Sequence, residues 1–208
     1  MNVEGMGIIK VRLTGVSPLL MHSPQGANPL DPLAKELKKI TGKKKKTDED
    51  HQKMSDLDWQ LGIYYDEEIG PFMPAENIDK CLVEGGKNFK LGTTILKSCT
   101  TMLYRVPLEY DGPRDFKALM ESSVHRDSRG VKIGGRSTVI RTRPRFNRWA
   151  LEFDVHFKTE AIDWEDVVRS LEAAGRYCSL GDYRPRYGQF EVEVINIKEL
   201  KKLSDKAA

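Results

Sequence analysis

The residues with the most evident chemistry are a run of cations in the second half of the sequence. Between Arg126 and Arg148 there are eight basic residues and a single acid, Asp127. The run consists of Arg126, Arg129, Lys132, Arg136, Arg141, Arg143, Arg145 and Arg148. A guanidinium group binds two phosphate oxygens at once, and a solvated charged face normally interleaves cations with acids. The run therefore predicts contacts with phosphate groups.

The spacing within the run predicts how some of these cations are presented. If residues 139–143 are extended, Arg141 and Arg143 share one face of a strand, because side chains two apart point the same way. Arg145 continues that face beyond the kink at Pro144. We expect these three guanidinium groups to form a stripe.

Two further groups of residues are candidates for contacts with nucleic acid. Phe146 and Trp149 stand at the end of the run, and their planar rings are suited to stacking on bases. A second basic segment follows a glycine and consists of Lys43, Lys44, Lys45 and Lys46. Four lysines can each neutralise one phosphate, but a mobile solvated loop explains the same composition equally well.

The loop at residues 181–188 is the other candidate. It holds two glycines, two tyrosines and two arginines between an expected helix and an expected strand. Its candidate binding residues are Gly181, Tyr183, Arg184, Arg186, Tyr187 and Gly188. Tyrosine rings stack on bases and arginines bind phosphates, so the composition of the loop is suited to binding single-stranded nucleic acid.

Catalytic and metal-binding patterns are weak. His22 lies at the edge of a proline-rich and glycine-rich loop, but the sequence indicates no partner for it, which favours an ordinary histidine. The sequence has no Cys-x-x-Cys pair and no phosphate-binding Gly-x-x-x-x-Gly-Lys-Ser/Thr pattern. We expect no metal, no cofactor and no enzymatic activity.

Composition sets broad limits. The 208 residues can bury a substantial core, and 34 Lys and Arg against 31 Asp and Glu give a net charge of only +3. Three cysteines without ligand spacing suggest buried thiols in a reducing cytosol. No apolar stretch approaches the length of a membrane span and no signal-peptide core is present. We therefore expect a cytoplasmic protein without membrane contacts.

The last third of the sequence contains the clearest elements. Residues 149–157 alternate between large apolar and polar side chains, which predicts a strand with one buried face. A helix is expected to begin after Asp163 and to end at Gly175, and a second alternating run begins at Phe190. The strand, the helix and the second strand should form one compact unit.

The rest of the chain supplies the remaining elements. Residues 8–13 alternate as an opening strand, and residues 16–62 are expected to be a helical insertion with helices at 31–40 and 47–61. Further elements are expected as a hairpin at 62–73, a helix at 74–85, a strand at 101–108 and a helical turn at 115–120. Residues 111–147 are expected to be a basic insertion or hairpin.

The order strand, helix, strand, strand, helix, strand is that of a ferredoxin-like or RRM-like domain. The sequence resembles the RAMP superfamily of CRISPR-associated proteins, particularly backbone subunits that coat guide RNA. The resemblance rests on LTGVSPLL at residues 13–20, PAENI at 74–78 and LGDYRPRYGQF at 180–190. In layout the chain also looks like uncharacterised proteins of phages and mobile elements, with a shared Arg-x-Arg-Pro-x-Phe-x-x-Trp segment, in which case it would act in the host cytoplasm.

The resemblance implies a single RRM-like domain over residues 1–208, of α+β class, with inserted helical and basic segments. Such a sheet offers an open face to single-stranded nucleic acid. Gly181 and Gly188 match the positions at which glycine lets backbone amides approach phosphates, with Arg184 and Arg186 adding charge. The expected function is non-catalytic binding of single-stranded RNA or DNA, with the protein multimerising along the strand as a homo-oligomer or filament.

Two alternatives remain open. Some RAMP relatives cut RNA without a metal, in which case His22 or His125 would be the general base and Tyr183 or Lys132 would assist. The chain can also be a subunit that mainly binds other proteins.

Overall fold

The largest sheet of the computed structural model, which describes residues 5–133 and 137–199, has the strand order β11-β1-β10-β5. Neighbouring strands are antiparallel, and a short fifth strand, β7, also pairs with β10. The strands are β1 (Met6–Gly15), β5 (Cys99–Thr101), β7 (Glu109–Tyr110), β10 (Trp149–Lys158) and β11 (Phe190–Glu199). The protein is therefore of α+β class with antiparallel sheets, as the sequence predicts.

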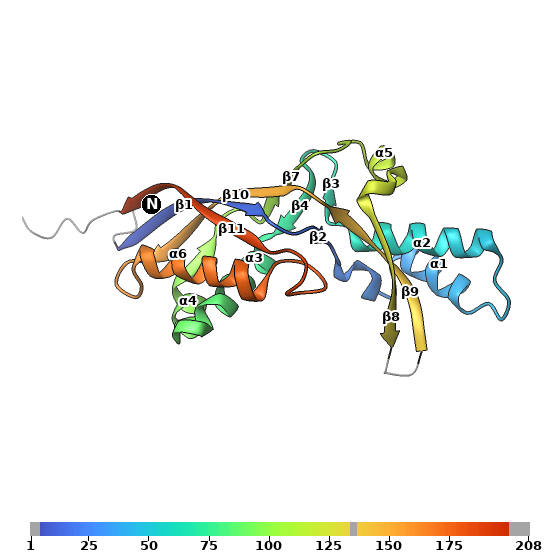
Figure 1. The fold of residues 1–208 in the computed structure, drawn as a ribbon, viewed down its shortest axis with the longest axis horizontal. Helices are drawn as coiled ribbons and strands as arrows, with labels where there is room; N and C mark the ends of the chain where they lie inside the picture. Colours follow the sequence, from blue (N-terminus) through green and yellow to red (C-terminus); the bar gives the residue numbers. More distant parts are fainter. Residues whose placement is uncertain (1–4, 134–136, 200–208) are drawn as a thin grey trace, which may run out of the picture.

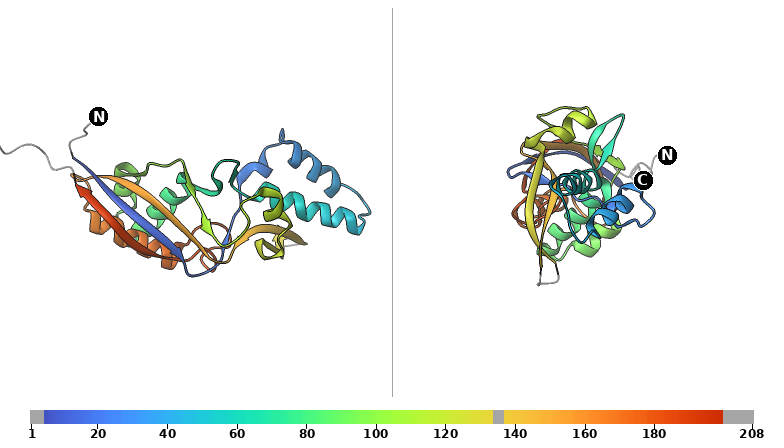
Figure 2. Two further views of the ribbon diagram at one scale, coloured as in Figure 1. Left: turned by 90° about the horizontal axis from the view of Figure 1, so that it is seen from above. Right: turned by 90° about the vertical axis from the view of Figure 1, so that its right-hand side faces the viewer.

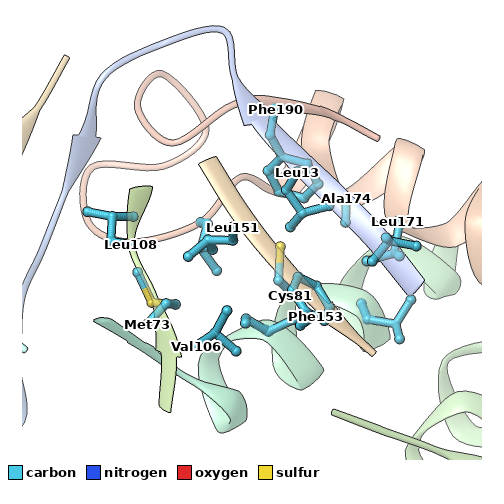
Figure 3. Close-up of a cluster of buried hydrophobic side chains, with 14 of the residues drawn as sticks. Leu13, Met73, Cys81, Val106, Leu108, Leu151, Phe153, Leu171, Ala174 and Phe190 are labelled. Carbon is cyan, nitrogen blue, oxygen red and sulfur yellow. The ribbon is translucent and has the colours of Figure 1, made fainter. Parts of the chain in front are cut away.

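Helices cover one face of this sheet and leave the other uncovered (Figure 1). The alternation of apolar residues explains the burial, since Leu13 pairs with Leu151 and Val11 with Phe153 on the covered face. The covering helices are α3 (Ala75–Gly86), α4 (Gly92–Ser98) and α6 (Trp164–Ala173). Figure 3 shows the resulting core, where Cys81 of α3 lies among the sheet side chains.

A second part of the molecule extends from one end of the sheet (Figure 1). It consists of η1 (Pro24–Ala27), α1 (Pro32–Thr41), α2 (Asp48–Gly62), α5 (Phe116–Glu121), η3 (Ser123–His125), β8 (Arg126–Ile133) and β9 (Ser137–Phe146). Strands β8 and β9 form a long hairpin that lies on α2, and the Oγ of Ser55 is 2.8 Å from the Oγ1 of Thr142. The molecule is elongated because this second part continues from the end of the main sheet along its long axis (Figure 1).

Small elements join the two parts. The strand β2 (Leu19–Leu20) pairs with β9, while β3 (Tyr65–Asp66), β4 (Gly70–Pro74) and β6 (Arg105–Pro107) form a small antiparallel sheet. The 3-10 turn η2 (Lys87–Phe89) links α3 to α4. Because β2 follows β1 directly, the end of β1 leads the chain from the main sheet to the hairpin.

Most expected elements are present, and two of them are corrected. The expected strand at 101–108 is split into β5 and β6 by residues 102–104, whose side chains are exposed. The expected stop at Gly175 is also wrong, because α6 continues as a π-helical turn, η4 (Ala174–Cys178). The left-handed residue is instead Ser179, with φ of 63°. Gly175 is needed for close contact, since a Cβ there would lie 2.2 Å from the Phe190 carbonyl oxygen.

Candidate functional site

The loop at 181–188 and the β8–β9 hairpin meet on one surface, although they are far apart in sequence. The Asp182 N–H donates to the Leu20 carbonyl at 2.8 Å, and the Gly188 N–H donates to the Pro18 carbonyl at 2.9 Å. These bonds anchor the loop on the segment that carries β2, which in turn pairs with β9. We call the surface formed by this loop, His22, Arg129, Arg143 and Arg145 the junction surface.

At the centre of the junction surface Arg129 lies between two tyrosines of the loop. Its guanidinium carbon is 4.6 Å from the ring centroids of both Tyr183 and Tyr187, and its Nη2 donates to the Tyr187 hydroxyl at 2.9 Å. The same side chain forms two hydrogen bonds to the Asp127 carboxylate, and these raise the pKa of Arg129. This stacking holds the loop against the hairpin.

Beside it, two ionisable side chains and one backbone N–H converge on the Asp182 carboxylate. Arg143 Nε donates to the Asp182 carboxylate at 3.0 Å, and His22 Nδ1 lies 3.4 Å from the same oxygen. Burial by itself raises the pKa of Asp182, but hydrogen bonds from His22, Arg143 and the Tyr183 N–H outweigh it and hold that pKa well below its usual range. His22 therefore has the partner that the sequence did not indicate.

The junction surface also carries arginines that are weakly paired or form no close ion pair. Arg184 is partly compensated, since, after the larger effect of the Lys87 hydrogen bond, its charge helps to lower the pKa of Glu84 on α3. Arg184 and Arg186 are exposed, and neither makes an ion pair or hydrogen bond within residues 5–133 and 137–199. Arg145 bonds Asn147 at 2.7 Å and lies 4.0 Å from the Asp127 carboxylate. With two carboxylates, Asp127 and Asp182, against five arginines, the surface has a net positive charge.

The rest of the arginine run is more neutral than the sequence suggests. Acids from α2 compensate two members, since Arg126 pairs with Asp56 at 2.7 Å and Arg141 pairs with Asp58 at 2.9 Å. The exposed Arg148 lies 3.7 Å from Asp111. The expected stripe of Arg141, Arg143 and Arg145 is therefore largely paired. Arg136 lies outside the described residues.

The aromatic residues at the end of the run do not offer rings to bases, so this expectation is wrong. Phe146 is fully buried, and Trp149 is 3 % exposed and donates its indole N–H to the Ser17 carbonyl at 2.9 Å. A signal in the sequence pointed to this outcome, since Trp149 begins the alternating run on its apolar side. The ring packs against Phe190 instead.

The glycines of the loop serve close contacts within the fold. A Cβ on Gly181 would lie 2.3 Å from the Leu20 carbonyl oxygen, and one on Gly188 would lie 1.7 Å from the Leu180 carbonyl oxygen. Both have positive φ, at 83° and 73°. The Gly188 N–H already donates to Pro18, so it is not available to a phosphate.

The lysine segment lies elsewhere. Residues 43–46 form the turn between α1 and α2 at the far end of the molecule from the main sheet (Figure 1). Lys43 pairs with Asp50 at 2.6 Å, and Lys46 donates to the Lys43 carbonyl at 2.9 Å. Lys44 and Lys45 are exposed and make no ion pair with any described residue. The structure therefore does not bring these lysines to the junction surface.

The uncovered sheet face does not have the composition expected of an RNA-binding sheet. Its side chains include Glu152, Asp154, Glu191 and Glu193, with Lys10 and Arg12 between them. Among the described residues of β1, β10 and β11 that point outward there is no Phe, Tyr or Trp ring, and His156 supplies an imidazole. Lys158 and Lys198 lie on the same face, so its four carboxylates are matched by four cations and it has no excess of positive charge for phosphates. The expectation that this face holds nucleic acid is therefore not supported.

Other reactive groups are buried. His125 is 4 % exposed and its Nδ1 lies 3.0 Å from the Arg145 carbonyl oxygen, so it cannot act as a base on RNA. Burial raises the pKa of Cys81 to about 12 and that of Cys99 to about 11, which keeps both as thiols. No described cluster of three His, Cys, Asp or Glu residues is arranged to hold a metal ion. Nor does any described helix have the length and apolarity to cross a membrane.

The fold and the site define the chain as an α+β protein with antiparallel sheets and a cationic junction between a loop and a hairpin. No protein-family model matches it, and no curated protein matches it.

Proposed function

We propose that the protein binds single-stranded RNA or DNA through the junction surface without catalysing a reaction, in the cytoplasm. The observation that carries this proposal is that Arg184 and Arg186 are exposed and unpaired on a loop whose tyrosines are held in place by Arg129. Unpaired guanidinium groups on a fixed backbone bind phosphate oxygens at a low entropic cost. The neighbouring carboxylates are already occupied by Arg129, Arg143 and His22.

The fold supports the same proposal. We infer a ferredoxin-like core in which β1, α3, β5, β10, α6 and β11 supply the order strand, helix, strand, strand, helix, strand. The sheet order β11-β1-β10-β5 agrees with a split βαβ arrangement, which is the core expected from the resemblance to RAMP proteins. In this proposal the bound strand of nucleic acid follows the loop and the hairpin at the end of the sheet, not the uncovered sheet face.

Fluorescence anisotropy with labelled oligonucleotides tests the site. The double variant Arg184→Ala/Arg186→Ala should bind roughly tenfold more weakly at low salt, since two phosphate contacts are lost. The slope of log affinity against log salt should fall by about 1.4, because each phosphate contact on a single strand contributes about 0.7.

The matched control is Lys97→Ala/Lys117→Ala, which removes two exposed cations from α4 and α5, outside the loop and the hairpin that form the junction surface. It should leave the affinity nearly unchanged. Wild-type protein that ignores oligonucleotides at low salt would contradict the proposal. If the two double variants lose the same amount of oligonucleotide affinity, only the net charge of the protein matters and the junction surface is rejected as the binding site.

A second candidate function, metal-independent cleavage of RNA, is favoured by the contact of His22 with Asp182. The His22 Nδ1 lies 3.4 Å from the Asp182 carboxylate and 3.5 Å from Arg143 Nη2. If Nδ1 donates to the carboxylate, Nε2 is left for proton transfer, and the His22 side chain is 53 % exposed. Arg143 on the same carboxylate can stabilise the charge of a phosphorane transition state.

Incubation of labelled RNA with the protein and a chelator tests this second function. If His22 is the base, products should form and His22→Ala should reduce their rate by about 100-fold or more. The control His51→Ala changes an exposed histidine on α2 and should cleave as the wild type does. Intact RNA after incubation with wild-type protein leaves non-catalytic binding as the function.

A further inference from the structure

A groove between η1, α1 and β9 adjoins the junction surface. Its volume is about 340 Å³, and the cations that line it are Lys35 and Lys38 of α1 and Arg141 of β9. The other described residues that line it are uncharged, and none of them has an aromatic ring. We call this cavity the α1 groove. A concave site lined by cations and by no described carboxylate suits an anionic ligand.

Backbone contacts place the α1 groove next to the junction surface. The strand β2 pairs with β9, and the Met21 N–H just after it donates to the Pro144 carbonyl at 3.0 Å. His22 continues along β9, with its Nδ1 3.5 Å from Arg143 Nη2, and η1 follows almost at once. Arg141 and Arg143 lie on one face of β9 with about 7 Å between their Cα atoms. The groove is therefore the next site along β9 from the junction surface.

The helix that carries the two lysines is fixed in place. In both views of Figure 2, α1 (blue) lies beside α2 (cyan), and Ile40 of α1 is 5 % exposed. The acids of α1 and of its cap are already engaged. Glu36 forms an ion pair with Lys53 of α2, and the Asp31 carboxylate accepts the N–H groups of the first helical turn. These acids therefore do not compensate the lysines of the groove.

The cations of the α1 groove have free donors. Lys35 and Lys38 are exposed and make no ion pair in the part of the chain that the structure describes. Arg141 donates through Nη1 to the buried Asp58 at 2.9 Å, and its other guanidinium N–H groups have no acceptor among the described residues. Asp58 balances the charge of Arg141, so the groove carries the net charge of the two lysines.

We infer that the α1 groove binds two adjacent backbone phosphates of the strand that the junction surface holds. This inference rests on the proposed function and extends it to a second phosphate subsite. The strand would pass from Arg184 and Arg186 across Arg143 into the groove.

The spacing of the two lysines fits this ligand. Lys35 and Lys38 are three residues apart on α1, which puts their Cβ atoms about 5–6 Å apart on one side of the helix, so each can contact its own phosphate. The free N–H groups of Arg141 can bind either phosphate. Because no described lining residue has an aromatic ring, the groove should not distinguish one base from another.

Fluorescence anisotropy with a labelled oligonucleotide of about 16 nucleotides, long enough to reach both surfaces, tests the subsite. Lys35→Ala/Lys38→Ala should lower the slope of log affinity against log salt by about 1.4, since two phosphate contacts are lost. Combining it with Arg184→Ala/Arg186→Ala should lower the slope by about 2.8, because the two pairs contact different phosphates.

The matched control is Lys39→Ala/Lys117→Ala, which removes the same charge from exposed positions. Lys39 also belongs to α1 but does not line the groove, and Lys117 is on α5. This control should keep the salt slope of the wild type. Alanine is favourable in helices, so all these lysine variants should keep the melting temperature of the wild type.

Labelling of the wild-type protein provides a second measurement that needs no variant. Acetylation by an N-hydroxysuccinimide ester, followed by mass spectrometry of peptides, reports how accessible each lysine ammonium group is. A saturating oligonucleotide should protect Lys35 and Lys38 from acetylation. Lys39 and Lys117 should react as they do in the free protein.

The outcomes separate this inference from the proposed function. Wild-type protein that binds no oligonucleotide rejects the proposed function and the subsite with it. If Arg184→Ala/Arg186→Ala weakens binding and Lys35→Ala/Lys38→Ala does not, the junction surface stands and the α1 groove is rejected. The inference is also overturned if the control variant loses as much affinity as the groove variant, or if the oligonucleotide leaves Lys35 and Lys38 unprotected.

Discussion

Gly188→Ala should destabilise the protein by about 3 to 5 kcal/mol, measured as the free energy of unfolding in denaturant. The positive φ of 73° is unfavourable for any residue with a Cβ, and that atom would lie 1.7 Å from the Leu180 carbonyl oxygen. The contact is with backbone, so no side-chain rotation relieves it. The loop must move, which separates Tyr183 and Tyr187 from Arg129.

The structure offers a matched control for this prediction. Gly70 also has a positive φ, of 77°, but a Cβ there would meet no atom within 4 Å. Gly70→Ala should therefore cost only about 1 kcal/mol, which is the conformational penalty alone. If both substitutions reduce the free energy of unfolding equally, the close contact between residue 188 and the Leu180 carbonyl contributes nothing to stability, which contradicts the prediction.

Asp182→Asn should reduce the free energy of unfolding by about 2 kcal/mol at neutral pH, because it leaves the guanidinium of Arg143 without its carboxylate. The Arg143 side chain is only 11 % exposed, so water replaces the lost partner poorly. Asp111→Asn removes the partner of the exposed Arg148 and is the control, with little change expected. If Asp182→Asn reduces the free energy of unfolding as little as Asp111→Asn does, the Asp182 carboxylate does not stabilise the fold through Arg143.

The same variant should change the dependence of stability on pH. The pKa of Asp182 is lower in the folded protein than the ordinary value of about 3.9, so folding favours its charged form. The stability that the charged Asp182 contributes is fully present above the pKa of this carboxyl in the unfolded chain. It is lost as the pH falls through the lower pKa that the carboxyl has in the folded protein. Wild-type protein should therefore lose more stability than Asp182→Asn on acidification below about pH 4. The difference between the two curves isolates this residue, since other carboxylates contribute to both proteins.

Local pattern in the sequence was sufficient for most of the elements and for the α+β class of the fold. The alternation in residues 149–157 predicts β10, and the apolar stripe after Asp163 predicts α6, because both depend on neighbours a few residues away. Asp31 and Thr47 likewise mark the starts of α1 and α2. The alternation also placed Trp149 on the buried side, although its position beside the arginines suggested base stacking.

The candidate site depended on tertiary structure, since each arginine finds its partner far away in sequence. Arg126 and Asp56 are 70 positions apart, and Arg141 and Asp58 are 83 apart, so no window of the sequence shows that these charges cancel. The same holds for the 58 positions between Arg129 and Tyr187. The sequence by itself determined which residues carry charge, and which of them are paired, stacked or buried was decided by the folding that brings the loop onto the hairpin.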